Sequence, residues 1–103
     1  MTAPTIGRIV HYRLTEQDAN DINRRRKDAT KSNAGADRTG FVLHTGNHAL
    51  EGQLFPAIVV RVFNETTTTA NLKVLLDGND VYWATSRAHG DEPGRWTWPE
   101  VLS

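Results

Sequence analysis

The strongest chemical feature of the sequence is the run Arg-Arg-Arg-Lys at residues 24–27. The planar guanidinium of arginine matches phosphate oxygens, and a cluster of arginines can hold two or more phosphates. In the helix expected over residues 15–31, Arg25 and Arg26 lie within about 60° of Ile22, beside the apolar stripe. We therefore expect a ligand or a subunit interface at these arginines. The alternative is a solvated helix face, or salt bridges to the acidic C-terminal half of the chain.

A second feature is the segment His44-Thr45-Gly46-Asn47-His48, which lies in a glycine-rich stretch. Small residues allow backbone amides to approach a ligand, and Asn47 and His48 offer directional hydrogen bonds. His44 and His48 have the spacing of a helical metal site, but Gly46 disfavours a helix and a third ligand is not evident. We therefore expect no metal here. A structured turn is the alternative interpretation.

The tryptophans form a third group. Trp96 and Trp98 share one face if the chain is extended there, and Trp83 precedes them. Together they could stack a nucleobase, at about 1–3 kcal/mol per stack. In a chain this small, tryptophans also form the core, which is the alternative. The nearby Asp-Gly-Asn-Asp at 77–80 is typical of a hairpin turn and is too short for a calcium loop.

Motifs for catalysis are lacking. His11, His89, Asp91 and Glu92 could be arranged as an acid–base pair, but so could residues of most domains. The sequence has no nucleophile elbow, phosphate-binding loop or metal-hydrolase motif. We therefore expect a protein that is not an enzyme and that has no cofactor.

Composition narrows the class of protein further. The chain has 103 residues and no cysteine, which excludes disulfides, thiolate zinc sites and thiol nucleophiles. Its formal net charge is zero, which argues against duplex DNA as a partner and leaves assembly into a homo-oligomer plausible. The longest apolar stretch, residues 57–60, is too short to span a membrane. Since the N-terminal residues lack a signal pattern, we expect a cytoplasmic protein.

The charges are nevertheless distributed unevenly. Residues 1–50 carry eight basic and five acidic residues, whereas residues 51–103 carry four basic and seven acidic residues. A basic N-terminal part and an acidic C-terminal part could attract each other, within one chain or between copies. Only a few arginines then remain for a compact anion.

Residue patterning predicts a mainly β fold with one helix. Alternation and apolar runs predict strands over 6–14, 55–63, 72–76 and 81–85, with shorter ones at 41–43 and 94–98. The 55–63 segment is apolar on both faces, as in a central strand. Thr15 and Asp18 form a capping box that begins the helix.

These elements predict a single domain over 1–103. The expected architecture is a small bent antiparallel sheet or partly open barrel. The helix and a loop arm, about 15–54, are inserted after the first strand. Because such a chain has a modest core, the arm is expected to be buried against a second copy.

Four stretches together resemble a group of small proteins encoded by tailed phages and prophages, especially of actinobacteria. These are Gly7-Arg-Ile-Val-His-Tyr12, Ile22-Asn-Arg-Arg-Arg26, Leu76-Asp-Gly-Asn-Asp80 with Trp83-Ala-Thr-Ser86, and Glu92-Pro-Gly-Arg-Trp-Thr-Trp-Pro-Glu100. The resemblance covers most of the chain. It implies a phage accessory protein acting in the cytoplasm of the host cell during infection, and it implies no particular chemistry.

Our first hypothesis is a phage-encoded anti-defence sponge that sequesters a small anionic, nucleotide-type immune signal of the host. Pockets between subunits would let so short a chain enclose a ligand. The expected ligand-binding residues are Arg24, Arg25, Arg26, His44, Asn47, His48, Trp83, Trp96 and Trp98.

The alternative hypothesis is a structural or protein-interaction protein, either a minor virion component or an inhibitor of a host protein. In that case the arginine run meets an acidic protein surface, and an edge strand pairs with a strand of the partner. A third hypothesis, binding of single-stranded nucleic acid, is weakened by the zero net charge.

Overall fold

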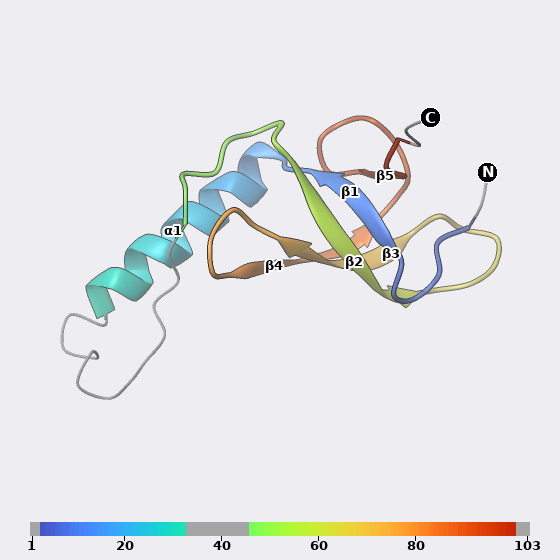
Figure 1. Ribbon diagram of the computed structural model, residues 1–103, viewed down its shortest axis with the longest axis horizontal. Coiled ribbons are helices and arrows are strands. Elements are labelled where there is room, and N and C mark those ends of the chain that lie inside the picture. The colour runs from blue at the N-terminus through green and yellow to red at the C-terminus, as the bar shows by residue number, and fades with distance from the viewer. Residues whose placement is uncertain (1–2, 33–45, 101–103) are drawn as a thin grey trace.

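A computed structural model describes residues 3–32 and 46–100 of the chain. One helix and five strands follow one another as β1 Ile9–Arg13, α1 Glu16–Ser32, β2 Leu54–Val62, β3 Ala70–Leu75, β4 Val81–Arg87 and β5 Trp96–Thr97. The strands form one sheet in the order β4-β3-β2-β1-β5, and every neighbouring pair is antiparallel (Figure 1). The predicted α+β fold, mainly β with one helix, is confirmed. Of the two expected forms, a small antiparallel sheet or a partly open barrel, the structure shows an open sheet with β4 and β5 at its edges.

The individual elements agree with the sequence patterns. The strand expected over 55–63 is β2, the central strand of the sheet. The expected hairpin is β3 and β4, joined by the turn at 77–80, and the expected C-terminal strand is the two-residue β5. The short strand expected at 41–43 lies outside the described residues. Of the loop arm, only the part from Gly46 onward is described.

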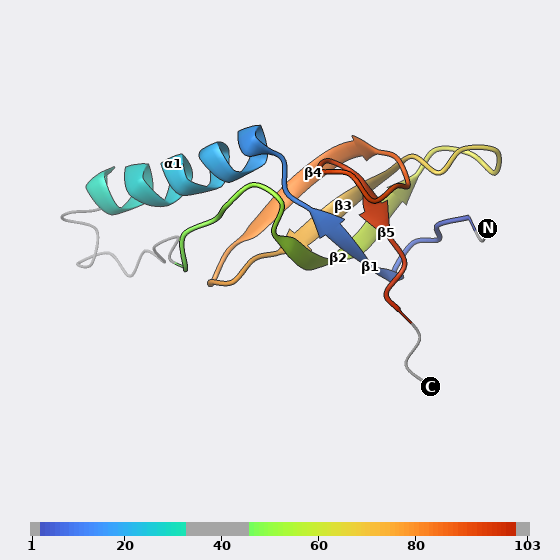
Figure 2. The same cartoon turned by 90° about the horizontal axis from the view of Figure 1, so that it is seen from above.

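The helix begins where the capping box predicts. The Thr15 hydroxyl accepts a hydrogen bond from the Asp18 backbone N–H at 2.9 Å, and the Asp18 carboxylate accepts one from the Thr15 N–H at 3.0 Å. This reciprocal pair satisfies amides that have no partner within the helix. Ala19 and Ile22 then anchor the first turns in the core, and the C-terminal part of the helix extends beyond the sheet (Figures 1 and 2).

The core lies on one face of the sheet, which we call the inner face. Side chains alternate along each strand, so Val10, Tyr12 and Val59 point to this face with the others of the cluster. They are fully buried together with Leu14, Ala57, Ala70, Leu72, Val74, Ala84 and Trp96. The opposite face, which we call the outer face, carries the alternate residues of the same strands.

Candidate functional site

Arg26, the residue expected to hold a phosphate, forms an ion pair within the chain. Its Nε and Nη2 donate to the two carboxylate oxygens of Asp80, both at 2.9 Å, and its Nη1 donates to the Asn47 carbonyl. The side chains of Arg26 and Asp80 are only 9% and 6% exposed. For this residue the geometry corresponds to the alternative interpretation, a salt bridge to the acidic C-terminal half.

Asn47 lies beside this ion pair at the tip of the β3–β4 hairpin. Its backbone N–H donates to the Asp77 carbonyl at 2.8 Å, and its side-chain amide donates to the Asp77 carboxylate at 2.7 Å. Gly46 is bridged to Gly78, and a Cβ added to Gly46 would lie 2.5 Å from the Asp77 carbonyl oxygen. The structure therefore brings Arg26 and Asn47 together, in a tightly packed junction between helix and hairpin.

His48 and Ala49 continue the junction along the helix. The amide of Asn23 donates to the Ala49 carbonyl at 2.8 Å and accepts from the Ala49 N–H at 3.0 Å. The same amide nitrogen lies 3.4 Å from the exposed imidazole of His48. His44, the other histidine of the segment, lies outside the described residues. The described part of the segment is thus a structured turn docked on α1.

The side chains of Arg24 and Arg25 contact other residues than Arg26 does. Arg24 is exposed and pairs with Asp21 at 2.7 Å, one turn earlier on the helix. The Arg25 guanidinium lies over the ring of Tyr82, 5.3 Å from its centre. Arg25 and Arg26 therefore flank the packing stripe, as the sequence predicts, but the three arginines meet three different partners.

The tryptophans do not form one wall. Trp96 is fully buried, and its indole N–H donates to the Thr68 carbonyl at 2.9 Å. Trp98 packs edge-on against Trp96 at 5.2 Å and lies under the Arg8 guanidinium. Trp83 is 58% exposed and projects from the outer face. The described residues of the expected ligand set are thus spread over the junction, the core and the outer face.

A buried carboxylate that sequence reasoning treated only as a helix cap connects three elements. The Asp18 carboxylate accepts hydrogen bonds from the hydroxyls of Tyr12 and Tyr82, at 2.5 and 3.0 Å, and from Arg87 at 3.3 Å. Burial, reinforced by the neighbouring Asp18 charge, raises the pKa of Tyr82 to about 12 and also raises that of Tyr12. Both tyrosines remain protonated near neutral pH, so this network fixes α1 to β1 and β4.

The outer face carries large apolar side chains that remain exposed. Register places Ile9, Ile58, Lys73 and Trp83 in one row across four strands. The apolar strand residues on or bordering this face that are between 37% and 58% exposed are Ile9, Leu54, Val60, Leu75, Val81 and Trp83. Solvated antiparallel sheets normally present polar residues to water, so this face is unusually apolar.

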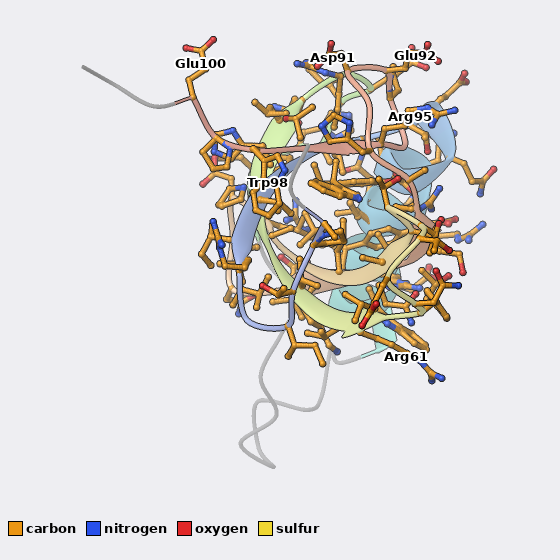
Figure 3. The ribbon with its side chains drawn as sticks, turned by 90° about the vertical axis from the view of Figure 1, so that its right-hand side faces the viewer. Arg61, Asp91, Glu92, Arg95, Trp98 and Glu100 are labelled. Atoms are coloured by element: carbon orange, nitrogen blue, oxygen red, sulfur yellow. The ribbon has the colours of Figure 1, made fainter. Side chains whose placement is uncertain are left out.

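The charges of the strands are all basic. None of the five strands contains an aspartate or glutamate, and Arg13, Arg61 and Lys73 lie at outer-face positions. Carboxylates occur beside the face, where Asp91 and Glu100 border a hollow of about 490 Å³ next to β1 and β5. Figure 3, which looks along the long axis, shows Asp91 and Glu100 at the top of the molecule and Arg61 near the bottom. The face is therefore apolar and basic, with an acidic margin at one end.

Sequence reasoning did not identify this face as a site, although one signal for it was present. The 55–63 segment is apolar on both sides, which normally means a strand covered on both faces. In the structure β2 is central, but Leu54 and Val60 remain exposed. The sequence of β2 is thus that of a strand covered on both faces, whereas in the structure only its inner face is covered.

Among the described residues, no group of three or more acidic or histidine side chains is arranged to hold a metal ion. Within the same part of the chain, the helix is not long and apolar enough to cross a membrane. Comparison of the chain with protein-family models, curated proteins and solved structures finds no match.

Proposed function

We propose that this chain is a protein-interaction protein and that the outer face of its sheet is the binding face. The observation that carries the proposal is the group of exposed apolar side chains on this face, of which Trp83 is the most exposed at 58%. Exposed apolar patches of this kind mark interaction sites in small proteins. Tryptophan is also among the residues that most often dominate binding energy.

The dimensions of the face suit a specific interface. Five strands about 4.8 Å apart and about six residues long give a flat area of roughly 500 Å². Side-chain relief makes the accessible area larger, and a standard interface buries about 800 Å² on each partner. Among the described strands, β4 lies at the edge of the sheet, and its outer backbone groups, beside Trp83, could pair with a strand of the partner.

The charges of the face indicate the partner. Because Arg13, Arg61 and Lys73 are its charged residues, it complements a surface that combines apolar side chains with carboxylates. In a symmetric pairing of two copies through this face, the charged strand residues on both sides would all be basic, which is unfavourable. We therefore propose a different protein with an acidic, apolar contact surface as the occupant.

The resemblance to small phage proteins adds a biological setting to this proposal. It makes a virion component or a host protein of the infected cell the natural partner. The hypothesis of a nucleotide-type ligand stays a prediction. The described residues of the expected ligand set lie in the helix–hairpin junction, the core and the outer face and do not form one pocket, so the geometry favours the protein-interaction hypothesis.

A comparative capture experiment tests the proposal. Immobilised wild type, Lys73→Arg, Lys73→Glu and Trp83→Ser are exposed to extracts of infected and uninfected host cells. We expect wild type and Lys73→Arg to retain one acidic protein that Lys73→Glu and Trp83→Ser do not retain. Once purified, this protein should bind wild type and Lys73→Arg more tightly than the other two variants. Four identical capture patterns would contradict the proposal. So would a homodimer in sedimentation that Trp83→Ser dissociates.

A further inference from the structure

A second hollow lies away from the outer face, between the end of β4, the start of α1 and the loop before β5. It has a volume of about 340 Å³, and its polar lining consists of Thr15, Ser86, Arg87, Glu92 and Arg95. Figure 3 shows Glu92 and Arg95 near one another, at the upper right of the view. Neither arginine belongs to the basic run of the helix, and neither is used by the proposed function.

The guanidinium of Arg87 is held in place by one hydrogen bond and has further N–H groups that could donate to a ligand. Its Nη2 donates to the buried Asp18 carboxylate at 3.3 Å, and the guanidinium lies 5.7 Å from the centre of the Tyr12 ring. Its Nε is buried and has no hydrogen-bond partner in the described part of the chain. A buried donor without a partner is costly, and a guanidinium carries five N–H groups in a rigid fork.

Arg95 lines the same hollow and is held less tightly. Its aliphatic stem packs directly against Gly90, and its Nη1 donates to the His89 carbonyl at 3.4 Å. Its nearest carboxylate is that of Glu92, 4.0 Å away and 82% exposed. Such an exposed pair is weak, so Glu92 can be displaced from Arg95 by a better acceptor.

Two hydroxyls complete the lining. The Thr15 oxygen accepts the Asp18 backbone N–H, which leaves its own proton to donate. Ser86 has a φ of 55°, a left-handed conformation uncommon for a residue other than glycine, and its N–H is held by the Asn71 side chain at 2.7 Å. Strain of this kind persists where the surrounding structure determines it, and it concentrates at functional sites.

We propose that this hollow binds a compact oxyanion of the phosphate type, through the guanidinium groups of Arg87 and Arg95 and the Thr15 hydroxyl. Two carboxylates oppose the anion. Asp18 is already shared among two tyrosines and the Thr15 N–H, and it meets Arg87 through one N–H only. Glu92 is exposed and competes with the anion for Arg95.

Titration with inorganic phosphate, followed by NMR of the arginine Nε–H groups, tests this site directly. We expect the Arg87 Nε–H resonance to shift with saturation at millimolar phosphate. Chloride at equal ionic strength should not reproduce that shift. Absence of a saturable shift at Arg87, or an equal shift with chloride, would overturn the proposal.

Two variants with matched controls separate the site from general charge effects. Arg95→Gln should weaken phosphate binding roughly tenfold or more, because it removes a charged donor. Glu92→Gln should strengthen it by removing the competitor. Arg24→Gln and Asp21→Asn make the same charge changes in the Arg24–Asp21 ion pair of the helix, which is not part of the hollow, and should leave the affinity unchanged. If they alter binding as much as the hollow variants, the site is not built as proposed.

The test is independent of the proposed function. Trp83 lies on the outer face, so Trp83→Ser should abolish partner capture and leave phosphate binding intact. Conversely, Arg95→Gln should leave capture intact. Loss of both activities in either variant would contradict the separation of the two sites.

Discussion

Arg26 and Asp80, 54 residues apart in the sequence, form a bidentate ion pair that fastens the helix to the tip of the β3–β4 hairpin. The pair links the basic N-terminal part of the chain to its acidic C-terminal part. Since both side chains are nearly fully buried, loss of either charge would leave a strong interaction unmade in a poorly solvated place. The arginine run therefore includes a structural residue, whatever its exposed members bind.

Removing one partner of this ion pair should destabilise the fold strongly. We expect Asp80→Asn to lower the free energy of unfolding by about 3 kcal/mol, because it removes the negative charge from the buried bidentate pair with Arg26. Glu65→Gln, in an exposed turn, should change it by less than about 0.5 kcal/mol. Urea denaturation of the two variants measures the difference. Equal effects would show that the ion pair is not structural.

The two tyrosines predict a loss of stability at high pH. Tyr12 and Tyr82 are the only tyrosines of the chain, and both have a raised pKa in the fold. Above about pH 10 the unfolded chain releases tyrosine protons that the folded chain retains, so the free energy of unfolding falls. For Tyr82 this window extends from about pH 10 to about pH 12.

Tyrosinate absorbance measures this effect without interference from other tyrosines. We expect it to stay low in the folded protein at a pH where the urea-unfolded chain is largely ionised. Tyr82→Phe should reduce the pH dependence of unfolding. Ionisation of both tyrosines near pH 10 in the folded protein would contradict the hydrogen bonds to Asp18.

The left-handed conformation of Ser86 predicts a stabilising substitution. Ser86→Gly should raise the free energy of unfolding by up to about 1 kcal/mol, because glycine adopts a positive φ without a Cβ penalty. Thr85→Gly, at the preceding strand position, should instead lower it by about 1 kcal/mol. Thermal unfolding of both variants shows whether each substitution raises or lowers the free energy of unfolding. A destabilised Ser86→Gly would show that the side chain of Ser86 makes a stabilising contact.

Local patterns account for most of the fold. Alternation identified β1, the apolar run identified the central β2, and the Asp-Gly turn placed the β3–β4 hairpin. The capping box of Thr15 and Asp18 fixed the start of the helix. Each of these signals lies within a few neighbouring residues, which is why the sequence alone was sufficient.

The candidate sites depend on contacts that no local pattern encodes. Nothing near Arg26 in the sequence indicates that Asp80 will neutralise it, and nothing near Arg87 indicates that Arg95 will line the same hollow. The spacing of Trp83, Trp96 and Trp98 likewise does not show that β4 presents one to solvent while β5 buries another. These facts follow from the order of strands and from which face the helix covers.

The most direct test of the central claim is calorimetric titration of the captured and purified partner against wild type, Lys73→Arg and Lys73→Glu. The outer-face account predicts that Lys73→Arg binds like wild type and that Lys73→Glu binds at least about tenfold more weakly, a difference of about 1.4 kcal/mol. Thermal unfolding should confirm that all three proteins are equally folded, since Lys73 is exposed. Equal affinities for all three would contradict the account.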